Sequence, residues 1–242
     1  MESLFDEKQA KHLMRFFKTA PGEYGYGDHF LGIKVPVTRQ IAAQSTALPQ
    51  SEVDILLNSQ WHEVRLCGFL ILVAQFEPFC KRHLLDNPQA MSHRDAIVEF
   101  YLKHARCANN WDLVDLSVYK ILGRWLLLPS SYNDNEKLDI VDRLASSDNL
   151  WEQRMSMVCT MEPLKHGDAS FTLRYAGWHL HHSHDLMHKA VGWLLREMGK
   201  RVSPDLLREF LESHAAAMPR TMLRYAIELL PGEERKLWLQ KK

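Results

Sequence analysis

The sequence predicts an all-α protein, an α-solenoid in which antiparallel helix pairs stack into a curved superhelix. Three observations support this fold class. Apolar residues recur at helical spacing along the chain, and most prolines and glycines fall between the periodic segments. No run of alternating residues is typical of a strand. Basic residues also recur at a fixed interval, since Arg154, Lys189 and Arg224 are each separated by 35 residues.

The segments around these basic residues resemble one another. Each basic residue precedes a small and apolar run, in EQRMSMVC from Glu152, MHKAVGWLL from Met187 and MLRYAIELL from Met222. EVRLCGFLIL from Glu63 has the same pattern and looks like the second helix of a HEAT repeat. A single helix pair cannot bury its apolar face, so we expect stacked pairs within one domain over 1–242. A non-repeating helical bundle is the alternative.

The one long stretch that does not fit a helix lies near the start of the chain. FKTAPGEYGYGDHFLGIKVP, from Phe17 to Pro36, contains four glycines and two prolines. It predicts an ordered loop that leads into a helix starting near Pro36. Its aromatic side chains, Tyr24, Tyr26 and Phe30, are expected to pack inward, although they could instead face a ligand.

Later helix starts are marked by residues that commonly cap helices. The predicted caps are Asn110 before Trp111, Asp185 for the helix running to Lys200, and Ser203 before Pro204.

Composition excludes several classes of protein. Thirty lysines and arginines balance thirty aspartates and glutamates, so any affinity for nucleic acid must come from a local basic patch. The four cysteines form no CxxC pair, which argues against a zinc ribbon or a disulfide framework. The N-terminal segment is acidic and amphipathic, unlike a signal peptide, and the apolar runs are too short to span a bilayer. We therefore expect a cytoplasmic protein with no membrane partner.

The segment ANNWDLVDLSVYKIL, from Ala108, places a carboxylate on an apolar helix stripe. On a helix, Trp111 and Asp115 fall in line with Val118 and Leu122. Asp112, in contrast, is interpreted as an ordinary acidic residue of a first helical turn.

A desolvated carboxylate at position 115 needs a partner or a function. Arg154 also intrudes on the apolar stripe of its own helix, so an Asp115–Arg154 pair is one explanation. The other is a carboxylate held at the bottom of a cleft and flanked by Trp111. The residue pattern does not decide between them.

The helix from Asp185 to Lys200 has two distinct faces. The predicted core face consists of Val191, Leu194, Leu195 and Met198. The opposite face consists of Lys189, Trp193, Arg196 and Lys200. A tryptophan among three cations can stack on a nucleotide while the cations neutralise phosphates. Packing of Trp193 against the next repeat is the alternative.

Other candidate sites have less support. HLHHSHD, from His179 to Asp185, places His181 and His184 three residues apart, but no further ligands follow at a recognisable spacing. We interpret it as a solvated helix end and expect no metal. The sequence also lacks a P-loop, a GxGxxG motif, a GxSxG elbow and an HExxH motif.

The chain has a recognisable pattern of five segments. In order they are FKTAPGEYGYGDHFLGIKVP, NWDLVD, SSDNLWEQR, HKAVGWLLREMGK and MPRTMLRYAIELLP. Together they resemble the AlkD-type DNA alkylation repair family, the HEAT-like-repeat DNA glycosylases, over nearly the whole chain. The resemblance implies a superhelix that cups duplex DNA on a basic concave face. It also implies excision of alkylated purines, notably 7-methylguanine and 3-methyladenine, as the first step of base excision repair.

The resemblance also implies roles for individual residues. Asp115, Trp111 and Trp193 correspond to catalytic positions, and the DNA-binding set is Arg154, Arg196, Lys189 and Lys200. Asn110 departs from the pattern, because some members carry a second aromatic residue there.

The implied enzyme is a monofunctional hydrolase that acts as a monomer in the cytoplasm, associated with the nucleoid through DNA. Water is the expected nucleophile, an abasic site the product, and no cofactor is required. A non-catalytic HEAT-like scaffold that binds DNA or protein is the alternative, because fold alone does not determine function.

Overall fold

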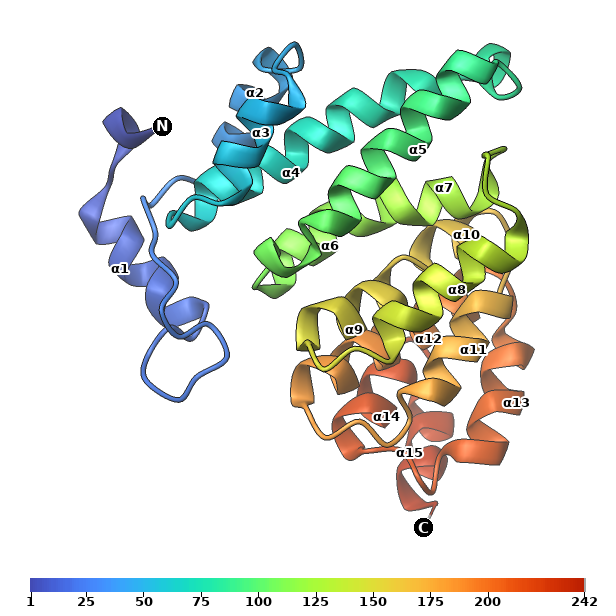
Figure 1. Ribbon diagram of the computed structural model, residues 1–242. Coiled ribbons are helices and arrows are strands. Elements are labelled where there is room, and N and C mark those ends of the chain that lie inside the picture. Colours follow the sequence, from blue (N-terminus) through green and yellow to red (C-terminus); the bar gives the residue numbers. More distant parts are fainter. Residues whose placement is uncertain (242) are drawn as a thin grey trace. The chain divides into compact units, whose positions relative to one another are not determined.

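The computed structural model describes residues 1–241 and consists of helices joined by loops (Figure 1). Within that range the only β-type pairing is one isolated bridge between His29 and Trp61. The all-α prediction is confirmed. The chain divides into two compact units, one comprising Met1–Ile121 with Leu128–Ser131, and the other Leu122–Leu127 with the chain from Tyr132 onward.

The N-terminal unit is organised around one long apolar helix. Its α-helices are α1 (Glu7–Phe16), α2 (Val35–Gln44), α3 (Gln50–Leu57), α4 (His62–Phe76), α5 (Pro88–Lys103) and α6 (Trp111–Val118). Helix α4 packs against α2, α3, α5 and α6. It is therefore buried on nearly all sides, as a helix that is apolar around its whole circumference should be.

Short helical turns precede, connect or follow these elements. They are the 3-10 helices Glu2–Leu4, Glu77–Cys80, Arg82–Leu84 and Ala105–Cys107, and a π-helix at Tyr119–Gly123 that follows α6.

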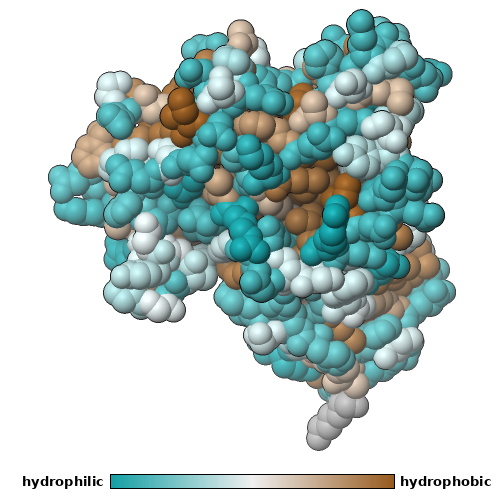
Figure 2. All heavy atoms as spheres, in the orientation of Figure 1, coloured by the Kyte–Doolittle hydropathy of each residue, from teal (hydrophilic) through white to brown (hydrophobic). Residues whose placement is uncertain are grey.

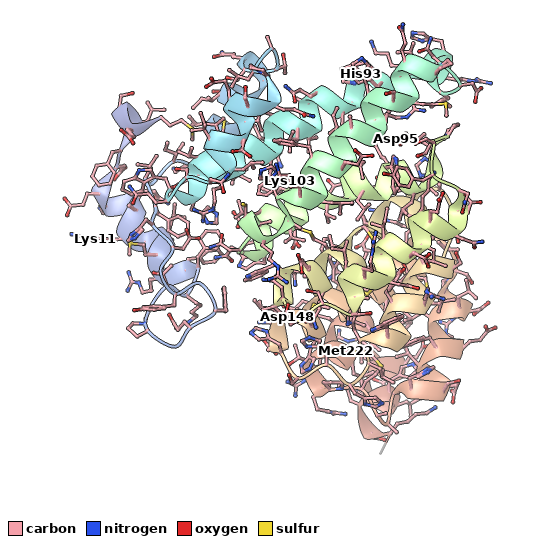
Figure 3. The ribbon with its side chains drawn as sticks, viewed as in Figure 1. Lys11, His93, Asp95, Lys103, Asp148 and Met222 are labelled. Atoms are coloured by element: carbon pink, nitrogen blue, oxygen red, sulfur yellow. The ribbon has the colours of Figure 1, made fainter. Side chains whose placement is uncertain are left out.

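Residues 128–131 belong to the N-terminal unit because polar side chains of α5 hold them. Asp95, labelled in Figure 3, accepts hydrogen bonds from the Ser130 hydroxyl at 2.6 Å and the Ser131 amide at 2.9 Å. The neighbouring Arg94 donates to the Pro129 carbonyl at 2.8 Å. Both oxygens of the buried Asp95 carboxylate are thus satisfied by hydrogen bonds.

The C-terminal unit is organised around α12. Its helices are α7 (Arg124–Leu127), α8 (Asp134–Ala145), α9 (Leu150–Val158), α10 (Met161–Lys165), α11 (Ser170–Trp178), α12 (Asp185–Arg201), α13 (Pro204–His214), α14 (Arg220–Ala226) and α15 (Gly232–Gln240). Helix α12 packs most extensively on α14. Gly192 permits this approach, because a Cβ there would lie 2.4 Å from the Met222 carbonyl oxygen.

The predicted loop and two of the three predicted caps are confirmed. Helix α1 ends at Phe16 and α2 begins at Val35, so the segment between them is a loop. Asn110 and Ser203 cap α6 and α13 with their side chains. The cap of α12, however, is His184 rather than Asp185, because the His184 ring accepts a hydrogen bond from the Leu186 amide.

The aromatic residues of the loop differ in environment. Phe30 is 2 % exposed, as predicted, whereas Tyr26 is 67 % exposed, and the prediction that it packs inward is wrong. The face shown in Figure 2 is largely hydrophilic, with hydrophobic residues gathered in patches among the hydrophilic ones.

Candidate functional site

The N-terminal unit contains an apolar pocket of about 450 Å³ that has carboxylates in its wall. It lies among α1, the loop that follows, and the first turns of α4 and α6. Its apolar lining includes Leu13, Phe16, Phe17, Phe30, Ile33, Val35, Pro36, Leu66, Trp111 and Leu116, and its polar lining includes His62, Glu63, Asp112 and Asp115. The pocket is therefore a low-polarity environment in which a charged group interacts strongly with a bound molecule.

Helix α6 brings Trp111 and Asp115 to this pocket together. The helix starts at Trp111 because the Asn110 side chain accepts a hydrogen bond from the Trp111 amide at 2.9 Å. Asp115 follows one turn later on the same stripe, and both side chains are half-buried. The sequence placed these residues on one stripe, and in the structure they line one pocket.

Aromatic rings hold Trp111 in place. Phe17 stacks on Trp111 with ring centroids 5.1 Å apart and on Phe30 with centroids also 5.1 Å apart. Phe16 meets Trp111 edge-on at 5.9 Å. Such contacts favour one orientation of the indole.

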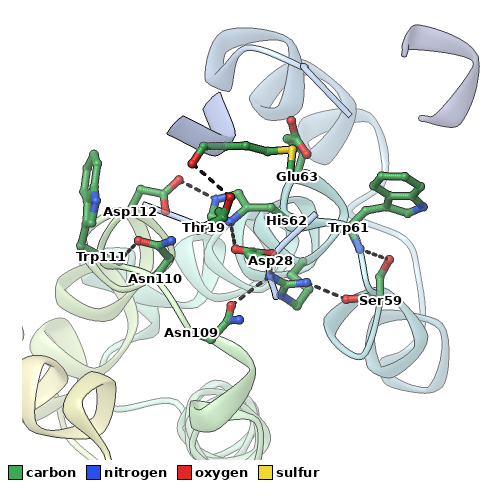
Figure 4. Close-up of polar contacts among 12 residues, drawn as sticks. Thr19, Asp28, Ser59, Trp61, His62, Glu63, Asn109, Asn110, Trp111 and Asp112 are labelled. Atoms are coloured by element: carbon green, nitrogen blue, oxygen red, sulfur yellow. Dashed lines mark hydrogen bonds and ion pairs between the residues drawn. The ribbon is translucent and has the colours of Figure 1, made fainter. Parts of the chain in front are cut away.

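Buried charged groups, two of which line the pocket, form a connected network (Figure 4). His62, the first residue of α4, contacts Asp112 of α6 through Nε2 at 2.9 Å and Asp28 of the loop through Nδ1 at 2.7 Å. Arg65 donates to the other oxygen of Asp28 at 2.5 Å and to the Asn109 side chain at 2.9 Å. The network therefore joins the loop, α4 and the start of α6.

The geometry identifies His62 as an imidazolium. Both ring nitrogens face carboxylate oxygens, which only accept hydrogen bonds, so both nitrogens must donate. Burial alone would lower the pKa of His62, but Asp112 and Asp28 outweigh it and raise this pKa to about 9. Burial likewise opposes ionisation of Asp28, yet His62 and Arg65 hold its pKa below the usual value. With His62 protonated, two positive charges balance the carboxylates of Asp28 and Asp112.

Glu63 secures the far end of the loop. Its Oε1 accepts hydrogen bonds from the amides of Gly32 at 2.8 Å and Ile33 at 3.0 Å, and its Oε2 accepts one from Leu31 at 2.8 Å. The side chain is buried, so the carboxylate replaces water as the partner of three backbone groups. This arrangement fixes the loop wall of the pocket.

Sequence reasoning missed this polar layer. Asp112 lies in the first turn of α6 as predicted, but it is 5 % exposed and bonded to His62, so the prediction that it is ordinary there is wrong. One signal was present: His62, Glu63 and Arg65 open an otherwise apolar helix, and buried polar groups require partners.

In the C-terminal unit, α12 has the predicted faces. Val191, Leu194, Leu195 and Met198 are all buried, as predicted. On the opposite face Trp193 is half-buried and Lys200 is exposed. Lys189 pairs with Asp185 at 2.8 Å, and Arg196 pairs with Glu228 and, at 3.3 Å, with Glu197.

Arg154, on α9, is 5 % exposed and donates to the Leu186 carbonyl at 2.6 Å. Its intrusion on an apolar stripe is confirmed. Because Asp115 lies in the other unit, their pairing stays a prediction.

The histidine segment before α12 is more ordered than expected. His179 is buried and contacts the Ser156 hydroxyl at 2.9 Å, and His182 contacts the Gln153 side chain at 2.8 Å. The expectation of a solvated helix end is therefore wrong for these two rings. Among residues 1–241, no group of three or more histidine, cysteine, aspartate or glutamate side chains is arranged to hold a metal ion.

None of the helices in the described part of the chain is long and apolar enough to cross a membrane.

Comparison with known proteins gives one family. A family model described as "DNA alkylation repair enzyme" matches residues 1–230 and so includes residues of both units. A solved structure titled "Predicted DNA alkylation repair enzyme from Enterococcus faecalis" is similar with a TM-score of 0.63. The two chains share 14 % identity over 94 % of this chain and 97 % of that one, a likeness that concerns the fold alone. No curated protein matches the chain.

Proposed function

Because the chain belongs to the DNA alkylation repair enzyme family, we propose that it is a monofunctional DNA glycosylase for alkylated purines. Its substrate would be duplex DNA carrying cationic N7- or N3-alkyl purines, and its reaction would initiate base excision repair. We also propose that 1–242 acts as one domain and as a monomer in the cytoplasm. The observation that carries the proposal is that Asp115 and Trp111 line the same, mainly apolar pocket.

The proposed reaction uses a fixed carboxylate to stabilise a developing cation. Alkylation gives the purine a positive charge and makes it a good leaving group. As the bond from C1′ to the base nitrogen breaks, that nitrogen keeps the electron pair and positive charge develops on the deoxyribose. Asp115, in a low-polarity pocket, would stabilise this charge and orient the attacking water. The water oxygen then bonds to C1′ and loses a proton, which leaves an abasic site and a free neutral base.

Two tryptophans would bind the cationic nucleotide. Trp111 offers the face of an indole to the sugar, and positive charge is attracted to such a face. Phe17 supports this role by restricting the ring. Trp193 is proposed as the second aromatic contact, since it lies on the cationic face of α12 and is half-buried.

Four basic residues are proposed to hold DNA phosphates, namely Arg154, Arg196, Lys189 and Lys200. Lys200 is exposed and Lys189 partly so, which leaves both accessible to a ligand. Arg154 and Arg196 already have protein partners, so DNA would have to share or replace those contacts. Alanine at Lys189 or Lys200 should weaken binding to all sequences and reduce the salt slope by about one per residue.

The decisive experiment measures base release from duplex DNA that contains 7-methylguanine. Wild-type protein should produce abasic sites. Asp115→Asn should lose about 10²-fold or more in rate, the scale for removing one group that stabilises transition-state charge, and still bind DNA. Asp86→Asn, at an exposed position of the same unit, is the matched control and should retain the wild-type rate.

Each alternative has its own outcome. Wild-type protein that binds methylated DNA but releases no base would contradict the enzyme and favour a non-catalytic scaffold. An active wild type with an equally active Asp115→Asn variant would contradict the role of Asp115 alone.

A further inference from the structure

The imidazole ring of His62 contacts the first turn of α6 through Asp112. Asp112 lies one turn before Asp115 on the same helix, and its Oδ2 contacts His62 Nε2 at 2.9 Å. We propose that the His62 imidazolium is a positioning residue: by holding Asp112 it fixes the orientation of Asp115 and Trp111 toward the pocket. This inference rests on the proposed glycosylase function, in which His62 acts through Asp112 and Phe17 rather than on the reacting atoms.

His62 is the one side chain that neutralises Asp112 in the described residues. Asp112 is 5 % exposed, and its second oxygen, Oδ1, is buried with no hydrogen-bond partner. A buried carboxylate with so few partners is costly to keep charged. Loss of the His62 charge would therefore strain the turn that carries the catalytic residues.

A second connection runs through the aromatic rings. The His62 ring stacks on Phe30 with centroids 4.3 Å apart and lies tilted against Phe17 at 5.0 Å. Phe17 in turn stacks on Trp111. The position of His62 is thus transmitted to both proposed catalytic side chains of α6, to Asp115 through the helix and to Trp111 through the rings.

The charged groups around His62 determine when it loses its proton. Asp28 faces it from the loop, Asp112 faces it from α6, and Arg65 on α4 binds Asp28 from the other side. Glu63, next in α4, is directed to the loop amides instead. The two facing carboxylates keep His62 charged at neutral pH, so the support should fail only in alkaline solution.

The first test is the pH dependence of single-turnover base release from 7-methylguanine DNA. The wild-type rate should be constant near neutral pH and fall above about pH 9, as His62 deprotonates. In Asp112→Asn one facing charge is gone, so the fall should move to lower pH. His62→Gln should lose about tenfold in rate, a size typical of groups that orient active residues, with DNA affinity unchanged and no alkaline fall.

The matched control is His29→Gln. It changes an exposed histidine next to Asp28 in the loop and should reproduce the wild-type dependence of rate on pH. The proposal is overturned if His62→Gln keeps the wild-type rate. It is also overturned if His62→Gln still shows the alkaline fall, because a purely structural side chain would leave that fall in place.

The second test does not depend on catalysis. Imidazole nitrogen NMR should show His62 doubly protonated at neutral pH, and the indole N–H signal of Trp111 should shift as His62 titrates. The pH-dependent shift of the Trp111 signal should be absent in His62→Gln. If that variant does not fold, Asp112→Asn is used instead, and there the shift should occur at lower pH. A neutral His62 ring, or a Trp111 signal insensitive to its titration, would overturn the positioning role. Wild-type protein that releases no base while both NMR results hold would instead contradict only the proposed function.

Discussion

Replacing Glu63 by glutamine should release the loop wall of the pocket. The carboxylate accepts three backbone hydrogen bonds, from Leu31, Gly32 and Ile33, at 2.8 to 3.0 Å. A glutamine keeps one oxygen, which can accept two of them. Its NH₂ group must then face the third amide, so a donor opposes a donor in a buried position.

The size of the effect follows from these contacts. A hydrogen bond to a charged group contributes about 1.5–3 kcal/mol, and an unpaired buried donor costs a similar amount. One bond lost and two weakened therefore destabilise the loop by about 3 kcal/mol, which corresponds to a roughly 100-fold larger opening constant.

Amide hydrogen exchange measures this opening residue by residue. The amides of residues 31–33 should exchange about 100-fold faster in Glu63→Gln than in wild type, while the core of α4 remains protected. Glu52→Gln is the matched control, because Glu52 is an exposed acidic residue in the first turn of α3. Unchanged exchange at residues 31–33 in Glu63→Gln would refute the assigned role of the carboxylate.

Three further predictions concern stability. The folded-state pKa of His62, about 9, exceeds the usual value of 6.5. The protonated ring should therefore stabilise the folded protein fully below about pH 6.5, and this stabilisation should be lost as pH rises through about 9. The urea midpoint of unfolding should fall over that pH range, and it should fall less in Asp112→Asn. Phe30→Ala should cost about 3–5 kcal/mol of unfolding free energy, because the ring is buried between Phe17 and His62; a loss below about 1 kcal/mol in urea unfolding would contradict this packing. Gly192→Ala should separate α12 from α14 and lower the melting temperature of the C-terminal unit. An unchanged melting temperature would show that α12 and α14 are not tightly packed at Gly192.

Features that depend on local sequence were predicted well. Helical periodicity gave the fold class, and Asn110 and Ser203 cap their helices because a capping side chain bonds within its own first turn. The core face of α12 likewise follows from spacing along one helix. The family resemblance drawn from five segments is confirmed by the family model over residues 1–230.

Features that depend on distant partners were not predicted. Nothing near Asp112 in sequence indicates that its partner is His62, which lies 50 residues away. The pattern indicated correctly that Asp115 and Trp111 share a stripe, but which side chains complete the pocket depends on how the loop returns to α4. The exposure of Tyr26 to solvent also depends on the course of this loop.

The His62 network also has a consequence for the order in which the chain is made. Its two carboxylates come from either side of His62 in the sequence, Asp28 34 residues before it and Asp112 50 residues after it. During synthesis the ring can bind Asp28 as soon as α4 has emerged, but it acquires its second carboxylate only when α6 leaves the ribosome. We therefore expect the nascent pocket to stay open, with its phenylalanines accessible to chaperones, until α6 has left the ribosome.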